Sequence, residues 1–526
     1  MTIYNSNLKM VMKKTNLFVM GLLAMSAVSL SSCSTDNDVT GAGIQTQTTS
    51  GTSYMSVKIV TPSATTSRAD VYDEYENGTQ AESEIQKIRF YLFNADGTPY
   101  VLTGGNSYVD VTNSEFIQNA TEEPDDQTVE SYTSAIVVMN GQTNTTPSKV
   151  VAIANPDIAL PSTIEDTPSL NQLTACVNRY TPTDNNFVMS TSVYVKDDAV
   201  VNYTSVDGYV STDKGNVKPV TIYIERVNAK VKVSNDLKDF NDTEEDVLGS
   251  DVYVKVNSWG IAQAASQSYL VKNLSTSYTG YMGWNWAEAY RSFWADTKPG
   301  TLTYISYKDA AKNFSTDAVY PMENTVDGST SQVLVNATLC DASGNAMTVI
   351  KLGGNYFKSD EDVKKQICTN LKNLGYKKTS TEDFTVGDIT IGTTKDTSIK
   401  SYEVVATVSK AFKDGEDATD QANNELLKMP IKYWKDGETY YFTDIYHNIL
   451  GKDGLKGLVR NHYYVVSLKS IKGLGTPVYN PEKTIEPPVK VDDDPSTYMS
   501  AEVKCLAWRV VKNNVDLNGE SVKKNN

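Results

Sequence analysis

The chain has 526 residues, of which 40% are hydrophobic, and a formal net charge of −16 at pH 7. This length and composition provide for two to four domains with real apolar cores and exclude a disordered chain. The negative charge argues against nucleic acid or anionic lipid headgroups as partners, because both are bound mainly through clustered Lys and Arg.

Residues 1–32 have the pattern of a lipoprotein signal peptide. Two lysines precede the apolar run 17–25, which is shorter than the roughly 20 residues needed to cross a bilayer. The run leads into Leu30-Ser31-Ser32-Cys33, which resembles a bacterial lipobox, so we expect Cys33 to be the lipidated first residue. Residues 33–50 are mostly small and polar, which predicts a flexible tether.

Beyond residue 50, short runs of β-branched and aromatic residues alternate with turn residues, which predicts a mostly β fold. Two hairpins are expected at Asp-Gly pairs, since Asp-Gly permits the positive φ angles of tight turns. One turns at Asp96-Gly97 after the run 88–93. The other turns at Asp436-Gly437 and joins 431–434 to 440–442.

The best helical pattern covers residues 360–374, where apolar side chains recur on one face, Ser359 can cap the start and Gly375 can close the end. We expect it to lie on a sheet. The run 220–233 alternates like one long strand.

Many short strands with few helices predict β-sandwich domains. We place the domain boundary near residue 235, before an Asp- and Glu-rich segment. The expected domains are 69–235 and 236–480, followed by a Pro- and Asp-rich arm and terminal strand at 481–526.

Motifs of catalytic chemistry are scarce in this chain. It has two histidines, His447 and His462, and no H-E-x-x-H, G-x-S-x-G or phosphate-loop motif. We therefore expect no enzyme activity, no cofactor and no metal site. Besides Cys33, the chain has four cysteines that lack metal-site spacing. Two interpretations are compatible with the sequence, namely free thiols or two disulfides. The four cysteines are Cys176, Cys340, Cys368 and Cys505.

An aromatic cluster at residues 278–294 holds Trp284, Trp286 and Trp294, half of the tryptophans in the chain. One interpretation is a glycan-binding platform, because sugars stack on aromatic faces. The other is a set of rings packed between a long loop and a sheet, since exposed aromatic patches are costly in water.

The first and last strands share a pattern. The first, 53–60, contains Tyr-Met-Ser and turns Met55, Val57 and Ile59 to one face. The last begins with the same three letters at Tyr498. Its inward residues would be Met499, Ala501, Val503, Cys505 and Ala507.

If both strands fit one groove, the last strand of one molecule could take the place that a neighbour's first strand vacates. The arm 481–495 carries prolines and aspartates, so we expect it to be extended and not to fold back. Residues 63–70 are small and polar, as favoured proteolytic sites are. Arg68 in this loop is either a cleavage site or one more surface residue.

Several pieces of the chain, in this order, resemble the fimbrillins of the Bacteroidales, the type V pilins, and among them the larger major subunit of the short fimbria. The matching pieces are the lipobox at Cys33, residues 224–231, Arg291-Ser292-Phe293-Trp294, residues 458–464, Gly473-Leu474-Gly475-Thr476-Pro477, and the C-terminal strand through Trp508.

The resemblance implies two transthyretin-like β-sandwich domains, export as an outer-membrane lipoprotein, and cleavage between Arg68 and Ala69 that removes residues 51–68. It also implies polymerisation by donor-strand exchange through residues 497–517, with Arg460, Asn461 and His462 in structural roles.

A stalk subunit of a surface fimbrium, supporting adhesion and biofilm formation, is the function implied. Its partners would be copies of itself, accessory subunits, and a host or bacterial receptor. The alternatives are a tip or anchor subunit and a monomeric glycan-binding surface lipoprotein.

Overall fold

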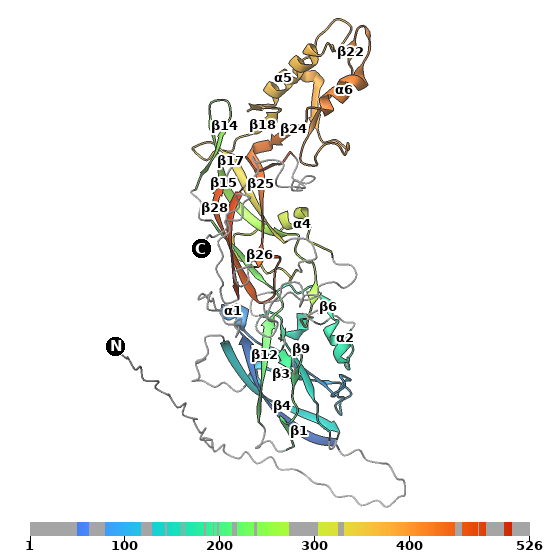
Figure 1. Cartoon of the computed structure of the whole chain (residues 1–526), viewed down its shortest axis with the longest axis vertical. Coiled ribbons are helices and arrows are strands. Elements are labelled where there is room, and N and C mark those ends of the chain that lie inside the picture. Colours follow the sequence, from blue (N-terminus) through green and yellow to red (C-terminus); the bar gives the residue numbers. More distant parts are fainter. Residues whose placement is uncertain are drawn as a thin grey trace, which may run out of the picture. The chain divides into compact units, whose positions relative to one another are not determined.

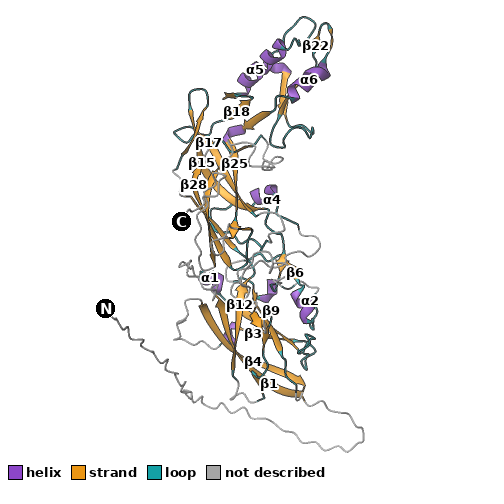
Figure 2. Ribbon diagram, in the orientation of Figure 1, coloured by secondary structure: helices purple, strands orange, loops and turns teal. Residues whose placement is uncertain are grey.

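The computed structural model describes residues 50–62, 79–116, 129–142, 145–158, 160, 164–182, 186–192, 194–196, 199–212, 218–235, 239–272, 303–324, 331–447, 455–471, 473–479 and 499–507. Strands predominate and helices are few and short (Figure 2), which confirms the mostly β fold. Within these ranges, no helix combines the length and apolar character that crossing a membrane requires.

The first body is a nine-stranded sheet (Figure 1). Its main path runs β11-β1-β12-β7-β5-β2-β3, while β4 pairs with β1 and β10 pairs with β5. In β12, Val220, Ile222 and Ile224 are buried and alternate with more exposed residues, so one face of the sheet closes over an apolar core. The strands are β1 (Ser50–Pro62), β2 (Lys87–Phe93), β3 (Tyr108–Thr112), β4 (Val129–Gln142), β5 (Lys149–Ala154), β7 (Met189–Thr191), β10 (Thr204–Ser205), β11 (Val210–Ser211) and β12 (Pro219–Arg226).

The second body consists of a three-stranded sheet, β13-β28-β30, and a five-stranded sheet, β14-β15-β17-β25-β29. Trp259, Val335 and Tyr464 belong to the core that the two sheets share. The strands are β13 (Lys230–Asn235), β14 (Asn241–Asp246), β15 (Asp251–Ala262), β17 (Gln332–Cys340), β25 (Glu438–Asp444), β28 (His462–Ile471), β29 (Thr476–Pro477) and β30 (Met499–Ala507).

An inserted lobe, residues 349–434, lies in the chain between β17 and β25 and has an apolar core of its own. Figure 2 shows its two helices beside short strands. The elements are β18 (Val349–Leu352), β19 (Asn355–Phe357), α5 (Asp360–Asn373), β20 (Ile389–Gly392), β21 (Val405–Val408), β22 (Phe412–Lys413), β23 (Glu416–Asp417), α6 (Thr419–Leu427) and β24 (Ile431–Trp434).

The remaining α-helices and paired strands of the described chain are short. They are α1 (Gln80–Ser83), α2 (Leu170–Thr174), α4 (Tyr307–Ala311), and the strand pairs β6 (Val177–Asn178) with β16 (Ser268–Tyr269), β8 (Tyr194–Lys196) with β9 (Ala199–Val201), and β26 (Tyr446–His447) with β27 (Leu455–Lys456). Residues from Thr48 onward form one compact unit, and the domain boundary expected near residue 235 stays a prediction.

The helix α5 confirms the pattern at 360–374. Ser359 accepts a hydrogen bond from the Asp362 amide, Gly375 has a φ of 85°, and the buried face includes Val363 and Leu371. The last apolar residue of the pattern, Leu374, is instead exposed, because it follows the final helical turn. The turn at Asp96-Gly97 is also confirmed, since the Asn94 amide donates to the Thr98 carbonyl across it.

Two strand expectations are wrong. The Asp436-Gly437 turn forms with both φ angles positive, but β24 pairs with β18, and β25 pairs with β17 and β29. A Cβ on Gly437 would collide with the Leu339 carbonyl oxygen, so this turn packs against β17 and sends the chain into another sheet. The run 220–233 is likewise two strands, because β12 ends at Arg226 and β13 starts a different sheet.

Cysteines are free thiols where the structure describes their side chains. Cys176 and Cys340 are buried and Cys368 is half-buried, all without a disulfide. Burial raises the pKa of Cys176 to about 11, so this thiol stays protonated and unreactive at neutral pH. The side chain of Cys505 lies outside the described part.

Candidate functional site

Strand β1 lies inside the sheet of the first body, not at its edge. On one side β4 runs antiparallel to it over its whole length, from Ser50 to Pro62. On the other side it pairs first with β11 and then, in parallel, with β12 from Ser56 to Val60. Figure 1 shows β1 and β4 side by side. Removing β1 would therefore open a slot with unpaired backbone groups along both walls, and we call this place the β1 slot.

The inward face of β1 fills the core of the first body. Met55 is 0% exposed and Val57 is 1% exposed, as the alternation in the sequence predicts. Ala135 of β4 is the register partner of Val57, and it is buried with it in the same core. Ile59 pairs through its backbone with Ile222, and its side chain lies outside the described part. Each large apolar side chain here contributes roughly 1.5–3 kcal/mol of burial free energy.

The C-terminal strand folds back onto its own chain, contrary to our expectation for the arm. β30 pairs antiparallel with β28, from His462 opposite Ala507 to Ile471 opposite Met499. The other edge of β28 is already taken by β13. An unpaired β28 edge would leave its peptide groups open, and β30 satisfies them. Of the expected inward residues, the described backbone includes Met499, Ala501, Val503, Cys505 and Ala507.

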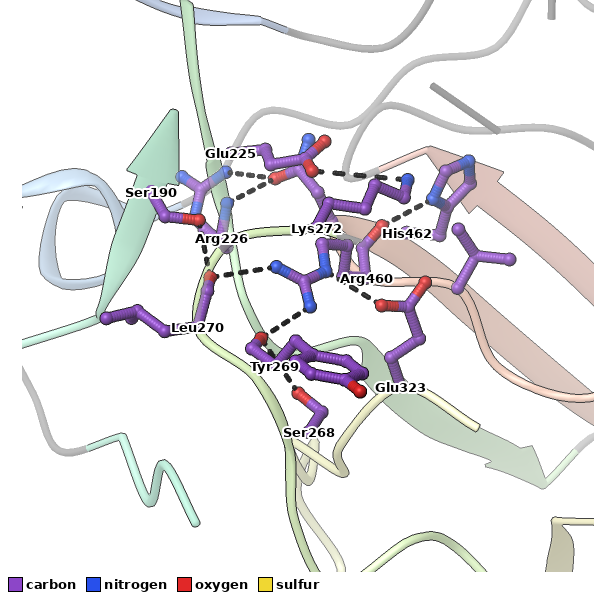
Figure 3. Close-up of polar contacts among 12 residues, drawn as sticks. Ser190, Glu225, Arg226, Ser268, Tyr269, Leu270, Lys272, Glu323, Arg460 and His462 are labelled. Carbon is purple, nitrogen blue, oxygen red and sulfur yellow. Dashed lines mark hydrogen bonds and ion pairs between the residues drawn. The ribbon is translucent and has the colours of Figure 1, made fainter. Parts of the chain in front are cut away.

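A buried polar junction connects the two bodies next to the start of β28 (Figure 3). The Arg460 Nε donates to the Glu323 carboxylate at 2.8 Å, and its two Nη groups donate to the Tyr269 and Leu270 carbonyls at 2.7 and 3.1 Å. The Leu270 carbonyl also accepts the Ser190 hydroxyl from β7 of the first body, at 2.7 Å. The Arg460 guanidinium thus connects the start of β28 to Tyr269 and Leu270, and Leu270 in turn contacts Ser190 of the first body.

His462 and Lys272 complete this junction. The His462 Nδ1 donates to the Arg460 carbonyl at 2.7 Å. Burial and the nearby Lys272 cation hold the pKa of His462 at about 4, so the ring is neutral at physiological pH. Lys272 itself is fully buried, with its Nζ 4.0 Å from a Glu225 carboxylate oxygen. Asn461, between Arg460 and His462, has a φ of 55°, which turns the chain into β28. These contacts agree with the structural roles that the resemblance implies for 460–462.

The junction was missed by the sequence reasoning. The available signal was a set of charged residues inside an alternating apolar run, namely Glu225, Arg226 and Lys230. Because buried charges need partners, these residues indicate buried polar contacts at this point of the chain. Several predicted site residues lie outside the described part of the chain. They are Cys33, Arg68, Ala69, Trp284, Trp286, Trp294 and Tyr498.

Two family models match the chain. The family described as major fimbrial subunit protein (FimA) matches residues 53–226, which begin within β1 and end with β12. The family described as major fimbrial subunit protein type IV, fimbrillin, C-terminal, matches residues 432–514, which include β28 and β30. The two stretches cover about half of the chain and contain both walls of the β1 slot and the last strand. The chain is a fimbrillin.

Solved structures resemble this fimbrillin at low identity. A putative cell adhesion protein from Parabacteroides distasonis is 13% identical, with 86% of this chain and 96% of that chain covered and a TM-score of 0.40. A putative cell adhesion protein from Bacteroides eggerthii is 11% identical, with the same coverage and a TM-score of 0.35. The tip fimbrial protein Mfa3 from Porphyromonas gingivalis is 10% identical, with 87% and 100% covered and a TM-score of 0.32. No curated protein matches the chain.

Fimbrillins are structural subunits, not enzymes, and the family places this chain in a cell-surface fimbrium. In the described residues, no group of His, Cys, Asp and Glu is arranged to hold a metal ion.

Proposed function

We propose that this fimbrillin is a stalk subunit that polymerises by donor-strand exchange. In this proposal it is exported as an outer-membrane lipoprotein with the lipid on Cys33. Cleavage between Arg68 and Ala69 then separates β1 from the rest of the chain. β1 leaves its slot, and the C-terminal strand of a neighbouring copy enters it. Accessory subunits and a host or bacterial receptor complete the set of partners.

The observation that carries the proposal is the interior position of β1. An edge strand can leave a sheet without opening its core, but β1 is hydrogen-bonded on both sides and contributes Met55 and Val57 to that core. A first body without β1 would expose apolar surface and two rows of peptide groups. Only another strand with alternating apolar side chains repairs both defects at once.

The pairing of β30 with β28 adds a step. In an unassembled subunit the last strand is occupied in its own chain, so it must leave β28 before it can enter a neighbour's slot. Both pairings offer ladder hydrogen bonds, and filling the apolar core that the loss of β1 leaves open favours the exchange.

An engineered disulfide tests the register of this exchange. Aligning the shared Tyr-Met-Ser puts Ala501 of the donor where Val57 sits, opposite Ala135 of β4. Opposed residues in antiparallel strands have Cα atoms about 4.5–5.5 Å apart, which a disulfide can bridge. We expect Ala135→Cys with Ala501→Cys, in a Cys505→Ala background, to join subunits covalently in fimbriae and to remain reduced in the unassembled precursor.

The control moves the second cysteine to Lys504, whose side chain would point to the opposite face of the donor. Oxidised fimbriae of the Ala501 variant should give a ladder in reducing-agent-free detergent gels, and those of the Lys504→Cys variant should not. N-terminal sequencing of the same fimbriae should start at Ala69. Monomers only, with a blocked Cys33, would instead indicate an anchor or a monomeric surface lipoprotein.

A further inference from the structure

The short helix α1 lies where the two bodies meet, and its buried carboxylate contacts the second body. Glu82 is 3% exposed. Its Oε1 accepts the Lys230 ammonium at 2.7 Å and the Tyr320 hydroxyl at 2.6 Å, and its Oε2 accepts the Thr79 amide at 2.7 Å. Lys230 is the first residue of β13, in the second body. Glu82 therefore attaches α1 to the start of the second body.

Arg226 attaches the same helix to the first body. It is the last residue of β12 and is almost fully buried. Its Nε donates to the Glu82 carbonyl and its Nη2 to the Ser83 hydroxyl, both at 2.9 Å. Its backbone amide donates to the Asn461 side-chain oxygen at 3.3 Å, just before β28. One arginine thus holds α1, the end of β12 and the start of β28 together.

The covalent connection between the bodies at this point is only three residues long, Val227 to Ala229. The Val227 amide donates to the Val188 carbonyl of the first body, and the Ala229 amide donates to the Pro321 carbonyl beside Tyr320. On another side of the same connection lies the Arg460 junction of Figure 3. So short a link would bend freely by itself, and these buried bonds oppose bending from two sides.

We propose that α1 is a clamp that locks the body carrying the β1 slot to the body carrying β28 and β30. The clamp makes one subunit a single stiff element. Tension applied at the β1 slot is then transmitted to the last strand without bending of the chain at 227–229. The second half of this inference, the transmission of tension, rests on the proposed function. The clamp itself is a property of the single chain.

The position of α1 in the sequence gives the clamp a second property. α1 follows the segment in which cleavage is proposed, and its bonds go to Arg226, Lys230 and Tyr320, which all remain in the processed chain. Removing residues 51–68 therefore leaves these bonds intact. The clamp keeps the junction closed while the first body lacks its interior strand.

Hydrogen exchange of the uncleaved full chain tests the clamp. The variants are Arg226→Lys, which keeps the charge but loses the fork of donors, and Glu82→Gln, which keeps the shape but loses the charge. The matched control is Arg89→Lys, because Arg89 makes a similar fork to Asp110 at 2.7 and 2.8 Å within the first body alone. The readout is amide exchange of the peptide containing Val227 and Ala229.

We expect at least tenfold faster exchange at this peptide in both clamp variants, with β2 and β28 peptides unchanged and the control like wild type. Unchanged exchange in both variants overturns the clamp. Exchange that rises equally in the control also overturns it, since it would reflect general loosening.

A second measurement separates the clamp from the proposed function. Fimbriae built from Glu82→Gln subunits should be more curved in electron micrographs, with a shorter persistence length than wild type. Equally straight fimbriae despite faster exchange would overturn the transmission of tension. Wild-type chains that never polymerise would sink the proposed function and leave the exchange result, and thus the clamp, standing.

Discussion

The Arg460 guanidinium donates to the Glu323 carboxylate across 2.8 Å, and neither side chain is accessible to solvent. Changing Arg460 alone to Met leaves the Glu323 charge buried without this cation. We expect the free energy of unfolding to fall by about 3–5 kcal/mol, measured by urea titration. The double variant Arg460→Met with Glu323→Leu removes both charges and should lose less.

An exposed pair serves as the control for this experiment. Lys365 lies 2.8 Å from Glu361 on α5, and both are largely exposed. Lys365→Ala should change the free energy of unfolding by less than about 1 kcal/mol. An Arg460→Met variant that is equally mild would contradict the account of a buried ion pair.

Met55 and Met139 make a matched pair for testing whether β1 leaves the fold. Both are fully buried in the core of the first body, but Met139 belongs to β4, which the proposed cleavage would leave in the chain. In the precursor, changing either to Ala should cost about 2–5 kcal/mol, seen as a lower melting temperature. In assembled fimbriae, Met55→Ala should melt like wild type and Met139→Ala should still melt early. Equal losses in the fimbriae would mean that β1 stays in place.

Acid should destabilise the chain through His462. Its pKa is about 4 in the folded chain, against an ordinary value of 6.5, so below pH 6.5 the unfolded chain binds a proton that the folded chain does not. Stability should therefore be full above pH 6.5 and fall steadily toward pH 4. His462→Gln should flatten the pH dependence of the urea midpoint in this window, and an unchanged slope would contradict the assignment to this ring.

Glu82 should act in a lower pH window. Burial raises its pKa, but the hydrogen bonds from Lys230, Tyr320 and the Thr79 amide outweigh this and hold the pKa below its usual range. The stability that this carboxylate contributes is present above its ordinary pKa of 4.5 and is lost as pH falls through the folded value. Glu82→Gln should remove that acid-sensitive part of the urea midpoint while leaving its pH dependence between pH 4.5 and 6.5 unchanged.

Gly437 and Gly353 separate a backbone cost from a collision. Both have positive φ. A Cβ on Gly437 would strike the Leu339 carbonyl oxygen, whereas a Cβ on Gly353 would have no heavy atom of another residue within 4 Å, apart from its chain neighbours. Gly353→Ala should lose on the order of 1 kcal/mol from the left-handed backbone alone. Gly437→Ala should lose clearly more in the same urea titration. Equal losses would show that β17 shifts to make room.

The elements that could be predicted from the sequence are those with a local cause. The alternation in β1 put Met55 and Val57 on the buried face, and the spacing of α5, with Ser359 before it, fixed both the helix and its cap. Each of these depends on side chains within one short segment, where period and capping chemistry decide the outcome.

The features that escaped prediction depend on residues far apart in the chain. The Asp436-Gly437 turn formed as expected, but contact with Leu339 decided which strands paired. Arg460 donates a hydrogen bond to Glu323, which is more than 130 residues away in the sequence, and no local pattern predicts that pair. The pairing of β30 with β28 also depends on residues far apart in the chain. β30 covers the free edge of β28, and no single segment of the sequence indicates that this edge is free.

The inserted lobe enters and leaves the second body at one place. Val349 at its start and Trp434 at its end are register partners on adjacent antiparallel strands, so their Cα atoms are about 5 Å apart. A tight turn of a few residues spans that gap. The part of the lobe between these two residues, which themselves belong to the core of the second body, could be exchanged for a foreign peptide or small domain without stretching β17 or β25. A fimbrium of such subunits would carry the graft once per subunit.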